Sequence, residues 1–154
     1  MGTHYHGTEQ EVQALNAYIV LLRAAESISS RVSNTLCDAE LTVSQFGVLE
    51  ALYHLGPLNQ SQLCAKLLKS SGNITLVVNN VARRALARRE RYGRDRRFVM
   101  VHLTDKGRHL VEQVMPSHVA AIVEEMRTLD PGEQETLRQL CRRLGRKERQ
   151  EPGP

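Results

Sequence analysis

The chain has 154 residues, of which 41% are hydrophobic and 25% charged, and its formal net charge is +4. This length predicts a single domain, and no apolar run approaches the roughly 20 residues that a membrane span needs. No signal peptide is visible, and the three cysteines lack C-x-x-C spacing. We therefore expect a soluble globular protein of a reducing cytoplasm.

A long amphipathic helix is predicted over residues 8–37, because Thr8 and Glu11 form a capping-box pattern and no proline or glycine interrupts the apolar positions that follow. A helix of this length spans about 42 Å, which is more than a small domain can cover. His4 and His6 precede it in a segment expected to be flexible. Their His-x-His spacing leaves a metal-dependent regulator open as an alternative, but we predict no metal site and no cofactor.

The next two predicted helices carry their own start signals. Thr42 and Gln45 begin a central helix with apolar residues all round, which Gly56 ends. Asn59 and Gln62 repeat the capping pattern at the start of a short helix that ends near residue 68. Two short helices joined by a few residues form a helix-turn-helix, and the second of the pair begins at residue 70.

That second helix has an apolar stripe of period 3.6, and Ser70 and Ser71 can cap its first turn. Amides, hydroxyls and a cation, the groups that hydrogen-bond base edges, lie on or beside the opposite face. These residues are Asn73, Thr75, Asn79, Asn80 and Arg83. Leu76 also lies there, either as an ordinary exposed leucine or as a contact for a thymine methyl group.

A burst of charge follows the helix, with eight arginines between residues 83 and 97 and only two acidic residues, Glu90 and Asp95, among them. It crosses a turn signal at residues 92–95 and enters an alternating strand at residues 98–103. A patch of one sign on a nearly neutral body favours a polyanion as partner over a solvated charged face. Because the chain has no tryptophan and only two phenylalanines, duplex DNA is favoured over single strands or RNA.

The motifs S-S-G-N-I-T at residue 70, D-R-R at residue 95 and V-H-L-T-D-K-G at residue 101 resemble the MarR family of bacterial winged helix-turn-helix regulators, over roughly residues 14–145. The resemblance implies a mostly α fold with a small antiparallel β-hairpin. It divides the single domain 1–154 into a DNA-binding lobe, residues 42–103, and dimerisation helices, residues 8–37 and 104–145. The segment Q-F-G-V-L-E-A-L-Y-H-L-G-P-L is similar to the branch of repressors that responds to quinones and catechols.

The resemblance also implies where the recognition helix ends. Pattern alone would continue the helix to Arg89, whereas the family turns into a strand, which we place over residues 86–91. The family usually has glycine where this chain has Ala85, so Ala85 is expected at positive φ, at a cost of about 1 kcal/mol. Asn79 and Ala82 stand where the family often has acidic residues, which makes this segment more basic.

As the resemblance implies, the hairpin tip is expected to reach the minor groove, with Arg97 inserted, alone or together with Arg94, and Asp95 orienting it. Arg88 and Arg89 are expected to contact backbone phosphates. The full set of predicted DNA contacts is Asn59, Gln60, Ser70, Ser71, Asn73, Thr75, Leu76, Asn79, Asn80, Arg83, Arg88, Arg89, Arg94, Asp95 and Arg97.

Two further helices are predicted after the hairpin. Thr104 caps the first, which Pro116 should kink, and Asp130 and Glu133 begin the second. The second is expected to bury the apolar residues of its own stripe. Those residues are Leu137, Leu140, Cys141 and Leu144.

No catalytic motif is found in the sequence, so a binding protein, not an enzyme, is predicted. The predicted function is that of a repressor that binds a pseudo-palindromic operator as a homodimer and is released by a small aromatic or quinone effector. Tyr18, Tyr53, His54 and His118 are the candidates for the effector pocket, although each also fits ordinary packing. The alternatives are a ligand-independent architectural DNA-binding protein and a regulator that senses thiol oxidation, with the loop residue Cys37 as the candidate.

Overall fold

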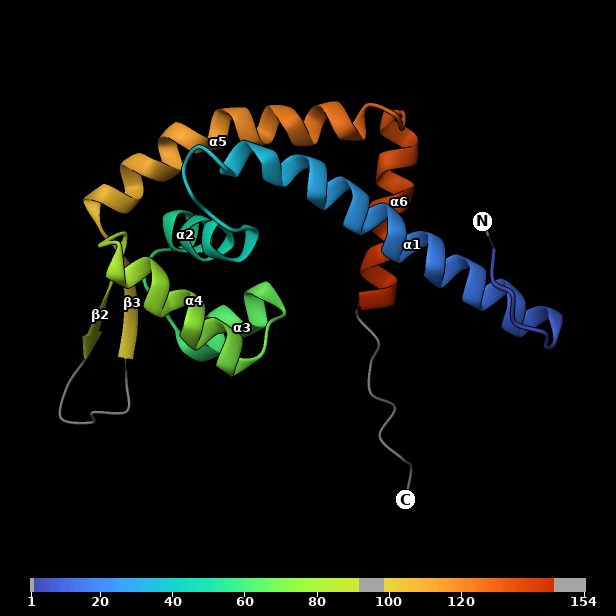
Figure 1. Cartoon of the computed structure of the whole chain (residues 1–154), viewed down its shortest axis with the longest axis horizontal. Helices are drawn as coiled ribbons and strands as arrows, with labels where there is room; N and C mark the ends of the chain where they lie inside the picture. Colours follow the sequence, from blue (N-terminus) through green and yellow to red (C-terminus); the bar gives the residue numbers. More distant parts are fainter. Residues whose placement is uncertain (1, 92–98, 146–154) are drawn as a thin grey trace, which may run out of the picture.

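The computed structural model describes residues 2–91 and 99–145. Its helices and strands follow one another in an order that confirms the predicted mostly α fold (Figure 1). The elements are α1 (Glu9–Ser33), the 3-10 turn η1 (Asn34–Leu36), α2 (Val43–Leu55), β1 (Leu58–Asn59), α3 (Gln60–Leu67), α4 (Ser71–Arg83), β2 (Ala87–Arg91), β3 (Val99–Leu103), α5 (Asp105–Met126) and α6 (Pro131–Gly145).

Local hydrogen bonds explain why the helices begin where they do. Both bonds of the capping box are present at the start of α1, α2 and α3, with Thr8, Thr42 and Asn59 as the N-caps. At α6, the backbone N–H of Glu133 donates to the Asp130 carboxylate and that of Asp130 donates to the Glu133 carboxylate, both at 2.9 Å. These starts are confirmed as predicted.

The β-sheet has one strand more than the predicted hairpin. The strand order is β1-β3-β2, all antiparallel, with Leu58 opposite Val101 on one side of β3 and Arg89 opposite Val101 on the other. A strand of two residues is too short to show an alternating pattern, so β1 could not be found from the sequence. It ties the start of α3 to the hairpin.

The hydrophobic core lies mainly in the DNA-binding lobe, residues 42–103, and extends to η1 and to the first half of α5. Helix α2 contributes five buried residues, which confirms it as the central helix. Helix α4 contributes four and α5 contributes Val111 and Val114. The lobe therefore has a closed core, and its outward faces are free for other contacts.

Helices α1 and α5 lie side by side above the lobe, and α6 turns down from the far end of α5 and crosses α1 (Figure 1). The Arg31 guanidinium donates to both carboxylate oxygens of Glu125, at 2.7 and 2.6 Å, and so joins α1 to α5. Helix α5 continues through Pro116. In the segment before residue 8, which was expected to be flexible, the N–H of Thr3 donates to the Asn16 side chain at 2.6 Å, so this part of the chain folds back on α1.

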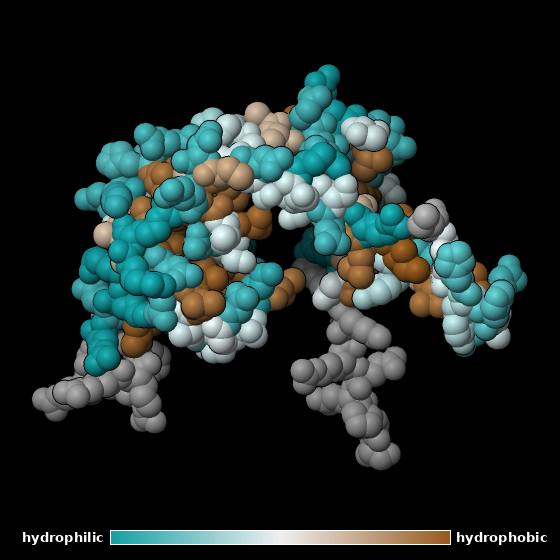
Figure 2. Space-filling view, viewed as in Figure 1, coloured by the Kyte–Doolittle hydropathy of each residue, from teal (hydrophilic) through white to brown (hydrophobic). Residues whose placement is uncertain are grey.

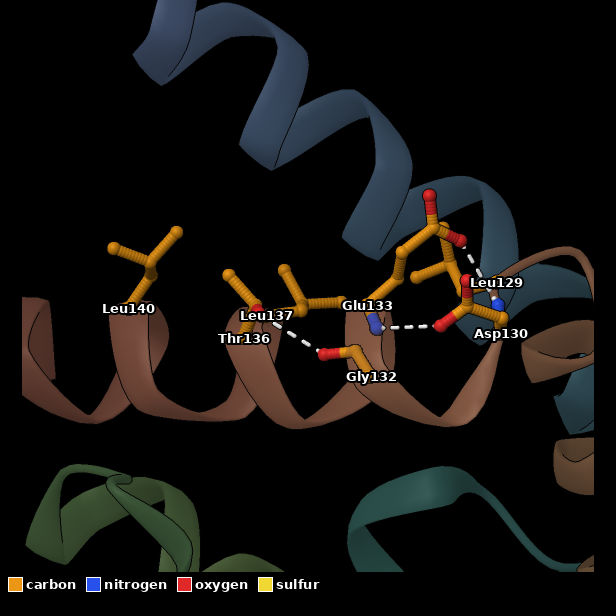
Figure 3. Close-up of a pocket in the computed structure, with 7 residues that line it drawn as sticks. All are labelled: Leu129, Asp130, Gly132, Glu133, Thr136, Leu137 and Leu140. Atoms are coloured by element: carbon orange, nitrogen blue, oxygen red, sulfur yellow. Dashed lines mark hydrogen bonds between the residues drawn. The ribbon is translucent and has the colours of Figure 1, made fainter.

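Two predictions about the outer helices are wrong for the single chain. The first helix ends at Ser33, and its expected last turn is the 3-10 turn η1. The stripe of α6 is not buried: Leu137, Leu140 and Leu144 are 37%, 49% and 67% exposed, and Cys141 is also exposed. Leu137 and Leu140 project from the same side of α6 (Figure 3), and apolar surface is visible in the region where α6 and α1 overlap in the view of Figure 2.

Candidate nucleic-acid interface

Helix α4 presents its polar face outward because its apolar face is held in the core. Ile74, Val77, Val78 and Val81 are buried, and the helix packs against α2 and α3. The Ser70 hydroxyl accepts from the N–H of Asn73 at 3.3 Å, which confirms the predicted cap. We call the residues on the opposite side the reading face. The reading face consists of Thr75, Leu76, Asn79, Asn80 and Arg83.

The reading face borders a hollow on the surface of the lobe. Leu76, Asn79, Ala82 and Arg83 of α4 line it, together with Arg89 of β2. Leu76 is 59% exposed there. Helix α4 and strand β2 therefore form one continuous surface, and a DNA phosphate in the hollow could contact side chains of both elements.

Hydrogen bonds fix the polarity of the amides on this surface. The Arg89 guanidinium donates to Oδ1 of Asn79 at 2.5 Å, and the Arg83 guanidinium donates to Oδ1 of Asn80. Because both amide oxygens accept from arginines, the outward hydrogen-bonding capacity of Asn79 and Asn80 lies mainly in their N–H groups. This end of the reading face is thus rich in donors, as required for phosphates and for guanine N7 and O6.

The start of the reading face is organised by Gln60 of α3. Its amide nitrogen lies 2.7 Å from the Thr75 hydroxyl, 2.8 Å from the Ser71 hydroxyl and 3.1 Å from the Ser71 carbonyl oxygen. The Thr75 hydroxyl in turn donates to the Ser71 carbonyl at 2.9 Å. The amide N–H groups of Gln60 are therefore directed at α4. Asn59, also predicted as a DNA contact, caps α3 through its side chain.

The arginine burst divides into residues with different roles. Arg83 and Arg89 lie at the hollow, whereas Arg84 donates to the backbone carbonyls of Glu40 and Ala39 at 2.7 and 2.9 Å. Arg84, which was not among the predicted DNA contacts, instead fixes the loop before α2. The sequence gives no signal that Arg84, rather than its neighbour Arg83, makes these bonds.

Arg88 and Glu90 of β2 form a salt bridge, with 3.0 Å between Nη1 of Arg88 and Oε2 of Glu90. The same carboxylate lies 3.1 Å from Nε2 of His102 on β3. Arg88 is exposed, so it can still meet a phosphate, but Glu90 offsets part of its charge. The sequence did not mark His102 or Glu90 as parts of this cluster, because their pairing depends on the strand register.

The turn between α4 and β2 takes the conformation that the resemblance implied. Ala85 has φ 57°, in the left-handed region, and β2 begins at Ala87. The Thr104 hydroxyl donates to the Ala85 carbonyl at 2.7 Å, and Nζ of Lys106 donates to the Arg84 carbonyl at 2.9 Å. The start of α5 thus holds the turn that directs the chain into the hairpin.

Arg94, Asp95 and Arg97 lie outside the described residues, so their minor-groove contacts remain predictions. The other predicted contacts at the start of α4 are exposed: Ser71 and Asn73 lie beside the N-terminus of the helix, where free N–H groups and the helix dipole favour a phosphate.

The four candidates for an effector site are not seen as one cluster. Tyr53 and His54 are ring neighbours with centroids 5.1 Å apart, and Tyr53 donates to Glu112 at 3.3 Å. His118 packs against Phe46, with ring centroids 4.7 Å apart, and its Nδ1 lies 2.9 Å from the Thr35 hydroxyl. Burial lowers the pKa of His118, and the charge of Glu50 opposes this shift.

Tyr18 of α1 is 59% exposed. The thiol candidate Cys37 is exposed after η1. In the described ranges 2–91 and 99–145, no group of three or more histidine, cysteine or acidic side chains is placed to hold a metal ion. None of the helices described there is long and apolar enough to cross a membrane.

The fold and this surface define a winged helix-turn-helix protein: a helix pair, α3 and α4, with a β-hairpin beside the reading face. A family model described as MarR family matches residues 39–97. The chain is 36% identical to the HTH-type transcriptional regulator YkoM of Bacillus subtilis over 138 residues, which cover 89% of this chain and 90% of YkoM. It is 34% identical to MhqR of the same organism, over 86% of this chain and 92% of MhqR.

The chain belongs to the MarR family and is a DNA-binding transcriptional regulator. Its fold is similar to that of BpsR from Bordetella bronchiseptica, with a TM-score of 0.78 and 27% identity over 84% of this chain and 98% of BpsR. The structure of BpsR concerns the regulation of its DNA binding by 6-hydroxynicotinic acid.

Proposed function

We propose that the protein is a cytoplasmic repressor that binds a pseudo-palindromic operator as a homodimer. The observation that carries this proposal is the hollow lined by α4 and β2, where Asn79, Arg83 and Arg89 present donors on the outward face of α4. A helix of this kind enters the major groove, while the hairpin follows the neighbouring backbone.

The homodimer is supported by the exposed apolar residues of α1 and α6. Tyr18, Leu22 and Leu140 are 59%, 48% and 49% exposed, outside the closed core of the lobe. Leaving such a surface in water is unfavourable by about 25 cal/mol per Å², and a two-fold interface would cover the same residues on both copies. Sedimentation at micromolar concentration should show a dimer. A stable folded monomer would contradict this part of the proposal.

An aromatic effector is the second part of the proposal. BpsR, which is 27% identical to this chain, is regulated by a hydroxylated pyridine carboxylic acid. Here Tyr53 and His54 lie on α2 and His118 lies on α5. A ligand held there would release DNA only by favouring a dimer with misplaced α4 helices.

The test is the affinity for duplexes selected by the protein from a random library, measured with and without a panel of phenols, quinones and hydroxylated aromatic acids. We expect at least one compound of the panel to weaken binding, and His118→Ala or Tyr53→Ala to remove its effect. Unchanged affinity with every compound would favour an architectural DNA-binding protein. A loss only after thiol oxidation, which Cys37→Ser prevents, would favour a redox sensor.

A further inference from the structure

We propose that Gln60 is a positioning residue that gives the first half of the reading face a preference for A·T base pairs. The inference rests on the proposed function, because it concerns which bases α4 reads. Gln60 lies at the first position of α3 and half-buried, and three acceptors surround its amide nitrogen. All three belong to Ser71 or Thr75 of α4.

The hydrogen-bonding capacity of Gln60 decides what it can do. Its amide nitrogen has two hydrogens, and these are shared among the Thr75 hydroxyl, the Ser71 hydroxyl and the Ser71 carbonyl. No donor is left over, so Gln60 can offer DNA only its amide oxygen as an acceptor. Its main role is therefore to hold α4 at a fixed distance and rotation relative to α3.

The same bonds restrict Thr75. Its hydroxyl hydrogen is given to the Ser71 carbonyl at 2.9 Å, and its oxygen accepts from Gln60 at 2.7 Å. Thr75 can therefore offer a base pair its methyl group and a remaining lone pair, but no donor. Both A·T and G·C pairs present an N–H donor and acceptors in the major groove, but only A·T presents a methyl group. The contact that favours A·T is therefore the one between the Thr75 methyl group and the thymine methyl group.

The donors of the reading face lie further along α4. The Asn79 and Asn80 oxygens accept from Arg89 and Arg83, so the N–H groups of those amides remain for acceptors such as guanine O6 and N7. The reading face thus presents a methyl group and acceptors near Thr75 and donors near Arg83. Gln60 determines what Thr75 presents, through its hydrogen bonds to Ser71 and Thr75.

The test compares the duplexes that wild type, Gln60→Met, Gln62→Met and Thr75→Ala select from one random library. Methionine keeps the length of glutamine but cannot donate. Gln62 is the matched control on the same helix, because its described role is to cap α3 through Asn59 at 2.9 Å. Thermal unfolding and affinity for random duplex are measured for each variant.

We expect Thr75→Ala to relax base preference at one A·T position of each half-site. Gln60→Met should relax the same position and lower affinity for the wild-type sequence about tenfold, without weakening random duplex. Gln62→Met should keep the wild-type profile. Replacing thymine by deoxyuridine at that position removes one methyl group and should weaken wild type about fourfold, as a buried methylene predicts, and should not affect Thr75→Ala.

A Gln60→Met profile identical to that of wild type would overturn the inference, as would an equal loss on selected and random duplexes, which indicates a structural role alone. A preference for G·C at the Thr75 position would overturn it too. If wild type itself enriches no sequence, the proposed function fails and the inference fails with it. Enrichment by wild type with an unchanged Gln60→Met profile sinks only the inference.

Discussion

The contact between the start of α5 and the end of the α4–β2 turn should be highly sensitive to Gly107→Ala. Gly107 is buried, and a Cβ atom built on it would lie 2.0 Å from the carbonyl oxygen of Leu86 and 2.8 Å from Cδ1 of Leu103. The Leu86 carbonyl is held in place, because it accepts from the N–H of Thr104 at 3.1 Å. The first turn of α5 must therefore move away from the lobe.

The cost has two parts. Forcing a methyl group into a packed site costs about 1–3 kcal/mol, and displacing Gly107 also disturbs its bond to the Thr104 cap, which is 3.0 Å long and of a kind worth about 1 kcal/mol. We expect the free energy of unfolding to fall by about 2–4 kcal/mol, which lowers Tm by roughly 5–15 °C in a protein of this size.

The assay is thermal unfolding followed by circular dichroism at one fixed protein concentration, because assembly makes Tm depend on concentration. Gly72→Ala is the matched control, since a Cβ there meets nothing within 4 Å. It should keep or slightly raise the unfolding free energy, as alanine is about 1 kcal/mol better than glycine in a helix. Equal Tm values for the two variants would refute the packing argument.

Three further predictions concern single side chains. Burial lowers the pKa of His118. Its contribution to stability is therefore fully present above the unfolded pKa of about 6.5 and is lost as the pH falls through the folded pKa. Between pH 7 and pH 5, the free energy of unfolding should fall less for His118→Gln than for wild type. Ala85→Gly should keep or raise the unfolding free energy by up to about 1 kcal/mol, whereas Ala85→Val should lower it by about 1–2 kcal/mol, since only glycine is unstrained at φ 57°. Arg84→Met should lower the free energy of unfolding by about 1–3 kcal/mol and change operator affinity little. Arg83→Met should lower operator affinity and change the free energy of unfolding little. Chemical denaturation and DNA titration of both variants check this.

Much of the lobe could be predicted because its signals are local. Capping residues such as Thr42 and Asn59 determine where helices begin through bonds three residues away, and the stripe on α4 fixes which face is buried. The left-handed Ala85 was expected only from the resemblance, because pattern alone would have continued the helix. The helix starts and the buried stripe depend on neighbours in sequence, so the sequence alone reveals them.

The features that the sequence did not reveal depend on distant contacts. The bonds of Arg84 to the Ala39 and Glu40 carbonyls join residues more than forty positions apart, and a stretch of arginines does not show which of them turns inward. Gln60 was predicted as a DNA contact, but its bonds to Ser71 and Thr75 could not be predicted because they depend on the packing of α3 against α4. The stripe of α6, in a segment assigned to dimerisation, was expected to be buried, but amphipathicity does not tell whether the same chain or a second copy covers the apolar side.

The central claim is that two α4 helices of one dimer read successive major grooves, about 34–36 Å apart. The most direct measurement is the affinity for a selected inverted-repeat duplex and for the same duplex with five base pairs inserted between its half-sites. Five base pairs are about half a helical turn, so the second half-site moves to the opposite side of the duplex. We predict that the insertion reduces affinity at least a hundredfold, to the level of random DNA, whereas equal affinity for the two duplexes would contradict the account.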